Sequence, residues 1–154
     1  MPDTQTSNAD KRKKTSGFIM ERTTKRMKQY FQRILSEADA GITVDQWVIL
    51  QQLQDEDGRS QLSLAKATFK DAPTVTRIID LLTQKGLVER ELDANDRRKF
   101  RICLTSTGRK KIEAVLPLVI QFRESAWAGL SNEQIDNLVH SLNHIFENLN
   151  KNQA

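Results

Sequence analysis

The stretch GLVERELDANDRRKFRICLT, residues 86–105, has the composition of two short strands joined by a charged turn. Runs of apolar and branched residues on either side of a polar turn are typical of a β-hairpin. We therefore predict strands over residues 87–92 and 99–105, joined by the turn DANDRR. Because successive side chains of a strand point to opposite faces, three apolar side chains of the second strand share one face: Phe100, Ile102 and Leu104.

The segment before this hairpin has the pattern of a capped amphipathic helix. Asp71 is a suitable N-cap, Pro73 is tolerated in the first turn, and Gly86 is suited to end the helix in the left-handed conformation. One helix face is apolar and carries Val75, Ile78, Ile79 and Leu82. A shorter helix is expected over residues 62–68. A short helix, a turn, a second helix and a hairpin together predict a winged helix-turn-helix.

The other face of the longer helix and the tip of the hairpin are polar, which favours duplex DNA as the partner. The second helix of such a motif enters the major groove, so its polar side supplies the groove candidates Pro73, Thr74, Thr76 and Arg77. The tip supplies three cations that can reach phosphates or a narrow minor groove: Arg97, Arg98 and Lys99. We assign Arg98 to the minor groove and Arg97 to a phosphate or a dimer contact, but a one-residue slip in the turn would exchange them.

Two acidic residues near these cations have supporting roles in the prediction. Asp96 is expected to hold an arginine through a charge-assisted hydrogen bond, because it would weaken binding if it faced DNA alone. Asp80 is expected to pair either with Arg77 or with an arginine of the hairpin. The alternative for the whole polar face is a solvated helix surface without any DNA contact.

Further helices flank residues 41–105, which contain the winged helix-turn-helix. Residues 17–40 are predicted to form an N-terminal dimerisation helix, and residues 106–150 two C-terminal dimerisation helices. The last helix carries an apolar stripe of Ile135, Leu138, Leu142, Ile145 and Leu149. One winged head does not require so many helices, so their apolar faces need a partner and we predict a homodimer. Ordinary core packing of this stripe is the alternative.

Composition and charge bear on the N-terminal tail, the class of partner and the cellular location. Residues 1–16 are polar and lack a hydrophobic period, which predicts a flexible basic tail whose Lys11–Lys14 run either contacts phosphates or stays solvated. The 154 residues carry a net charge of +4 with a pI near 9.3, which permits a nucleic-acid partner without requiring one. No apolar run approaches the roughly 18 residues of a membrane span. We therefore expect a cytoplasmic protein.

The residues around the hairpin also match a known motif. The segment TVTRIIDLLTQKGLVERELDANDRRKFRICLTSTGRKKI, residues 74–112, resembles the core of the MarR-type winged-helix transcriptional regulators. The matching pieces are VTR at 75–77, KGLVER at 85–90, DxxDRR at 93–98 and LTxxG at 104–108. The preceding helices are also similar to those of the family, in GITVDQWVIL at 41–50 and LSLAKA at 62–67. Leu81 and the TFKDAPT lead at 68–74 depart from the family pattern, which bears on the operator sequence.

The resemblance implies a homodimer that pairs its first and last helices and presents two winged heads to a pseudo-palindromic operator. Such a protein is expected to act as a repressor that a small aromatic or phenolic anion releases from DNA. Five residues are candidates for the effector pocket: Phe18, Arg22, Tyr30, Trp47 and Phe122. Arg22 is the cation that would pair with a carboxylate, and core packing of the aromatic residues is the alternative.

Two other functions stay open. Cys103 would serve an oxidant-sensing regulator, but a lone cysteine has no resolving partner within its chain, so a plain strand cysteine is favoured. A winged helix serving protein contacts alone is disfavoured, because the hairpin tip offers charges and nothing apolar. His140 and His144 lie opposite the apolar stripe, which favours a solvated surface over a metal site. Without a Gly-rich phosphate loop, a Ser/His/Asp pattern or a metal cluster, neither an enzyme nor a cofactor is expected.

Overall fold

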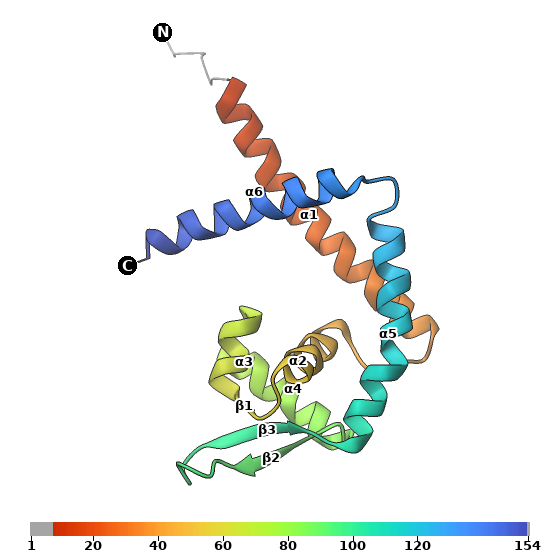
Figure 1. Cartoon of the computed structure of the whole chain (residues 1–154), viewed down its shortest axis with the longest axis vertical. Helices are drawn as coiled ribbons and strands as arrows, with labels where there is room; N and C mark the ends of the chain where they lie inside the picture. Colours follow the sequence, from red (N-terminus) through yellow and green to blue (C-terminus); the bar gives the residue numbers. More distant parts are fainter. Residues whose placement is uncertain (1–7, 154) are drawn as a thin grey trace. The chain divides into compact units, whose positions relative to one another are not determined.

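Helices dominate the computed structural model, which describes residues 8–153 (Figure 1). Along the chain it contains α1 (Asn8–Glu37), α2 (Val44–Asp55), β1 (Arg59–Ser60), α3 (Gln61–Thr68), α4 (Ala72–Gln84), β2 (Val88–Leu92), β3 (Phe100–Leu104), α5 (Ser106–Ala126) and α6 (Asn132–Lys151). These elements fall into two compact units, one ending at Phe122 and the other beginning at Arg123. The predicted class, mainly helical with a small β wing, is confirmed. None of the described helices is long and apolar enough to cross a membrane.

Local capping signals set where the helices begin. Thr43 starts α2 with a capping box, in which its hydroxyl accepts from the Gln46 backbone N–H at 3.2 Å. Asp71 starts α4 and accepts from the Thr74 backbone N–H at 2.8 Å, a bond that lowers the pKa of the Asp71 carboxyl. Gly86 follows α4 with a φ of +69°, in the left-handed region. The signals predicted at Asp71 and Gly86 are confirmed, because each depends on residues only a few positions away.

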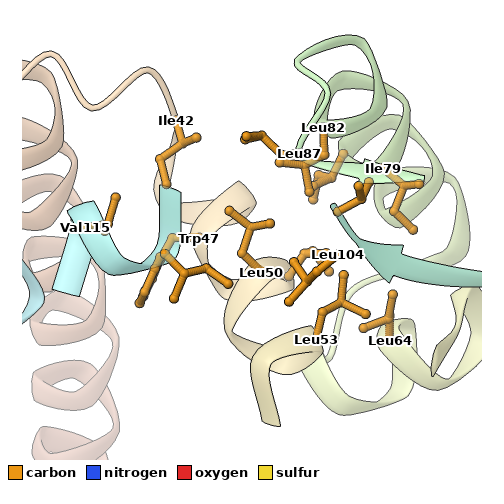
Figure 2. Packing of buried hydrophobic residues seen from close by; sticks show 14 of the residues in the cluster. Ile42, Trp47, Leu50, Leu53, Leu64, Ile79, Leu82, Leu87, Leu104 and Val115 are labelled. Atoms are coloured by element: carbon orange, nitrogen blue, oxygen red, sulfur yellow. The ribbon is translucent and has the colours of Figure 1, made fainter. Parts of the chain in front are cut away.

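The core of the first unit is built around α2 (Figure 2). Trp47 lies toward Val115 on one side of α2, whereas Leu50 and Leu53 face the helix-turn-helix and β3 on the other. The apolar stripe predicted for α4 is buried, with exposed fractions of 0% to 6% for Val75, Ile78, Ile79 and Leu82. Burial of this stripe turns the opposite, polar face of α4 outward.

The sheet has three strands in the order β1–β3–β2, one more than the predicted hairpin. The extra strand, β1, is anchored by Asp57, whose carboxylate accepts from the Leu104 backbone N–H at 2.9 Å and from the Arg109 guanidinium group at 2.7 Å. Gly58 is required beside it, because its φ is +73° and a Cβ there would collide with the Arg101 guanidinium group. A two-residue strand has no sequence period, so these distant partners specify it.

α1 begins earlier than predicted. The sequence favours a flexible tail over residues 1–16, but residues 8–16 are helical and residues 1–7 lie outside the described part. Alanine, lysine and arginine favour helix, and each residue added to an existing helix gains a hydrogen bond. The Lys11–Lys14 run is therefore displayed on exposed helical turns.

α6 is amphipathic, yet none of its residues is buried. It begins with a capping box, in which the Ser131 hydroxyl accepts from the Gln134 backbone N–H at 3.2 Å. The predicted stripe is largely exposed, at 45% for Leu138, 41% for Leu142, 43% for Ile145 and 61% for Leu149. Within the second unit, residues 123–153, this apolar face is therefore not covered.

Candidate nucleic-acid interface

The outward face of α4 presents the four residues predicted for the major groove, all of them exposed: Pro73, Thr74, Thr76 and Arg77. Thr74 donates its hydroxyl to the Asp71 carboxylate at 2.9 Å. Thr76 donates to the Ala72 carbonyl at 3.0 Å and accepts from the Gln61 amide, also at 3.0 Å. Both hydroxyl groups are therefore engaged within the protein, whereas Arg77 makes no ion pair with any residue from 8 to 153.

The wing strand β2 is fastened to the helix-turn-helix through Arg90. Its guanidinium group lies 2.5 Å from the Asp80 carboxylate of α4 and donates to the Gln61 amide oxygen of α3 at 3.4 Å. Gln61 in turn donates to Thr76, so four side chains join both helices of the motif to the wing. Of the two partners predicted for Asp80, the structure has the hairpin arginine rather than Arg77.

The predicted site residues do not include Gln61 or Arg90. Arg90 carries a signal in the sequence, because it lies two residues after the buried Val88 and the period of a strand turns both side chains to the same face. Gln61 carries no such signal, since its contacts depend on how α3 packs beside α4 and β2.

The wing tip is ordered by two aspartates that bind the backbone. Asp93 accepts from the Asn95 N–H at 2.8 Å, and Asp96 accepts from the Arg98 N–H at 3.0 Å. The partner predicted for Asp96 is corrected accordingly: it is the backbone of Arg98 rather than an arginine side chain. The short side chain of an aspartate reaches the backbone two residues further on, which is the geometry of an Asx turn.

Ordering the tip through its backbone leaves the tip charges exposed. Arg97, Arg98 and Lys99 are all solvent-exposed, and none forms an ion pair within the described part of the chain. Neighbouring like charges repel one another, and a polyanion beside them relieves that repulsion. Together with Arg77, they are the cations that this site offers to an anionic partner.

The turn between α3 and α4 is anchored by Asp45 of α2. The Asp45 carboxylate accepts from Lys70 of the turn at 2.7 Å and from Lys28 of α1 at 3.0 Å. Burial raises the pKa of Asp45, but the hydrogen bonds from both lysines outweigh burial, so the pKa is lowered overall. The charged Asp45 thus holds the start of α4 to α1 and α2.

The five residues predicted for an effector pocket are not brought together. The ring centroids of Tyr30 and Phe122 lie 6.4 Å apart, and the Arg22 guanidinium carbon lies 5.8 Å from the centroid of the Phe18 ring. Phe18 and Tyr30 lie on the same helix at a separation of about 18 Å along its axis. Trp47 belongs to the core, with 4% of its surface exposed. Arg22 and Phe18 therefore form a cation–π pair, whereas Tyr30 and Phe122 form an aromatic pair that packs against the core cluster containing Trp47.

Cys103 lacks the setting of a reactive thiol. Burial raises the pKa of Cys103, and the Glu91 and Asp57 carboxylates raise it further. A raised pKa lowers the population of the thiolate, the form that oxidants attack. His140 and His144 stack with their ring centroids 6.5 Å apart, and residues 8–153 contain no group of three or more side chains able to hold a metal ion.

Known proteins share this winged fold. Residues 40–99, which include the helix-turn-helix and the wing up to its tip, match the model of the MarR family. A MarR transcriptional regulator from Methanosarcina mazei Go1 matches with a TM-score of 0.78 and 28% identity, over 90% of this chain and 98% of that one. The winged helix-turn-helix of this chain is therefore similar to that of the MarR family. The family and the solved structure that this chain matches are transcriptional regulators rather than enzymes.

Two further solved structures with this fold concern DNA binding. A mutant MarR from E. coli, complexed with operator DNA, has 25% identity and a TM-score of 0.78, over 84% of this chain and 91% of that one. Bordetella bronchiseptica BpsR, whose DNA binding is regulated by 6-hydroxynicotinic acid, has 29% identity and a TM-score of 0.77. The match covers 85% of this chain and 98% of that one.

Proposed function

We propose that this protein is a cytoplasmic repressor of the MarR type that binds a pseudo-palindromic DNA operator as a homodimer. The observation that carries the proposal is the arrangement of its exposed cations. Arg77 projects from α4, and Arg97, Arg98 and Lys99 project from a wing that Arg90 fastens to α4. Cations on a helix and on an adjacent hairpin suit the major groove and the neighbouring minor groove of one duplex. The operator complex of the E. coli MarR mutant supports this proposal.

The contacts of each residue follow from its surroundings. Arg77 is the base reader, because a guanidinium group can bind both acceptors of a guanine edge in the major groove. Pro73, Thr74 and Thr76 lie in the first turns of α4, where contact with the phosphate backbone positions the helix. Arg98 enters the minor groove, and Arg97 and Lys99 bind phosphates. Asp96 keeps the tip ordered by accepting from the Arg98 backbone N–H.

Dimerisation rests on the uncovered face of α6. Leu138, Leu142, Ile145 and Leu149 are each more than 40% exposed, and an aligned second copy would remove their apolar surface from water. Ile135 extends the same stripe toward the start of the helix. A twofold dimer places two winged heads on half-sites about one helical turn apart, which is why we propose a pseudo-palindromic operator.

A small aromatic anion is the effector that the described residues suit best. Arg22 lies against the Phe18 ring and so offers a cation beside an aromatic surface, the combination that an aromatic carboxylate requires. Tyr30 and Phe122 form an aromatic pair further along the chain. The regulation of BpsR by 6-hydroxynicotinic acid supports an effector of this class. Oxidant sensing through Cys103 is disfavoured by the raised pKa of its thiol.

The test is a salt titration of binding between the full-length protein and duplex fragments that flank its gene. Affinity should fall by about 10³ to 10⁵ between about 50 and 200 mM salt, as expected for roughly 6 to 10 phosphate contacts. A duplex of unrelated sequence is the control and should bind more weakly with a similar salt dependence. Absence of binding to any duplex at low salt, or binding that salt does not change, would refute the proposal.

A further inference from the structure

The wing is not wholly polar, because two apolar residues lie at the base of its charged tip. Leu92 ends β2 and Phe100 begins β3, and the register places the two residues directly opposite each other. Their exposed fractions are 59% and 49%, whereas Ile102, two residues along β3, is fully buried. The two exposed side chains form a small apolar patch at the base of the charged tip, and we call it the Leu92–Phe100 pair.

The Leu92–Phe100 pair lies on the face of the wing that turns toward the helix-turn-helix. Side chains two residues apart in a strand share a face, so Phe100 shares the face of the buried Ile102 and Leu92 shares the face of Arg90. Arg90 on that face contacts Asp80 of α4. The pair therefore lies just past the part of the wing that α3 and α4 cover.

Positive charge flanks the pair on both sides. Toward the tip are Arg97, Arg98 and Lys99, and toward the helices is Arg77 of α4, whereas the charge of Arg90 is balanced by Asp80. An apolar protein partner would have to bury these charges, which is costly without paired anions. A partner that alternates anionic groups with apolar surface at short intervals matches this pattern instead. The sugar–phosphate backbone of DNA does so, because each phosphate is followed by a deoxyribose ring with exposed carbon atoms.

We propose that Leu92 and Phe100 pack against deoxyribose rings of the strand that separates the major groove entered by α4 from the minor groove reached by the wing tip. This inference rests on the proposed function, since it requires α4 and the wing to bind one duplex. The contact limits how far the wing tip enters the minor groove. The cations beside the pair bind phosphates, and the pair itself packs against the sugars. Contacts to sugars position a protein on the duplex without reading its sequence.

An apolar contact of this kind has its own signature in a salt titration. The slope of log affinity against log salt concentration counts the phosphate charges that the protein neutralises, and an apolar contact adds nothing to it. Loss of the contact should therefore lower the affinity at every salt concentration by the same factor. Loss of a phosphate-binding cation should instead reduce the slope.

The experiment compares full-length wild type with Phe100→Ser, Phe100→Leu and Cys103→Ser in salt titrations on the same duplex. Phe100→Ser should bind about tenfold more weakly with an unchanged slope, the size expected for hiding part of one aromatic side chain from water. Phe100→Leu keeps an apolar group and should stay within about twofold of wild type. Cys103→Ser lies on the same strand but the opposite face, so it is the matched control and should bind like wild type.

Three outcomes would overturn the inference. Wild-type affinity of Phe100→Ser would show that the pair contacts no DNA. A reduced slope for Phe100→Ser, as expected for loss of a phosphate-binding cation, would show that Phe100 acts only by placing the cations. A weakened dimer of Phe100→Ser in sedimentation would assign the pair to a second copy of the chain. If wild type binds no duplex at all, the proposed function fails as well, whereas these three outcomes leave it intact.

Discussion

α4 and α6 are both amphipathic helices with a regular apolar stripe, but only α4 buries it. The stripe of α4 is 0% to 6% exposed, because α2, α3 and β2 pack against it. In the stripe of α6, Leu138, Leu142, Ile145 and Leu149 are 41% to 61% exposed. The same sequence pattern therefore describes a core face in one helix and an uncovered face in the other. Periodicity reveals that a face is apolar, and the neighbouring elements decide whether the chain itself can cover it.

The difference separates the stability of the folded head from the stability of the association between two copies. A substitution in the α4 stripe should destabilise the folded head, since its neighbours belong to the same chain. A substitution in the α6 stripe should weaken association with a second copy and leave the head folded.

The largest effect should come from placing a charge in the α6 stripe. We expect Leu142→Glu to convert the dimer into monomers and to abolish operator binding, because a carboxylate would be buried in an apolar interface. Deletion of residues 132–154 should do the same. Sedimentation velocity measures the association state, and circular dichroism checks that the head remains folded.

The matched control is His140→Glu, which adds the same charge on the polar face of α6, opposite the stripe. It should remain dimeric and bind the operator. A stable, soluble dimer of the truncated protein would show that α6 is not the dimerisation element.

A core substitution in α4 should produce the next largest effect. Ile79→Ala removes a fully buried side chain and should lower the free energy of unfolding by about 2 to 5 kcal/mol, through lost burial and the cavity left behind. Leu81→Ala on the same helix is the control, because Leu81 is 38% exposed, and it should cost about 1 kcal/mol or less. Urea denaturation measures both values. Equal costs for the two variants would contradict the assignment of the α4 stripe to the core.

The smallest effect concerns the polar faces. Arg98→Ala should weaken operator binding by about 1 to 3 kcal/mol, because it removes one long cation from the minor groove. Arg77→Ala should instead change which base is preferred at one operator position. Glu147→Ala on the exposed surface of α6 is the control and should bind like wild type. Binding is measured on the operator and on versions altered in A·T-rich flanks, and wild-type affinity for folded, dimeric Arg98→Ala would exclude Arg98 as the minor-groove reader.

Much of the fold follows from short-range patterns in the sequence. Asp71 caps α4 and Gly86 ends it in the left-handed conformation, both as predicted, and Thr43 and Ser131 cap α2 and α6 by the same short-range geometry. The stripe of α4 and the spacing of the wing motif likewise identify the winged helix-turn-helix. Each of these signals depends on backbone geometry that repeats within two to four residues, so it can be read from neighbouring positions alone.

Other features depend on residues that are distant in the chain, and only the tertiary structure decided them. The two residues of β1 become a strand because Asp57 binds Leu104 and Arg109, about fifty positions away. Asp80 binds Arg90 rather than Arg77 because folding brings β2 beside α4. Trp47, a pocket candidate by its residue type, is buried in the core by its neighbours. A sequence pattern fixes which side chains share a face, whereas the partner of that face is set by how the elements pack.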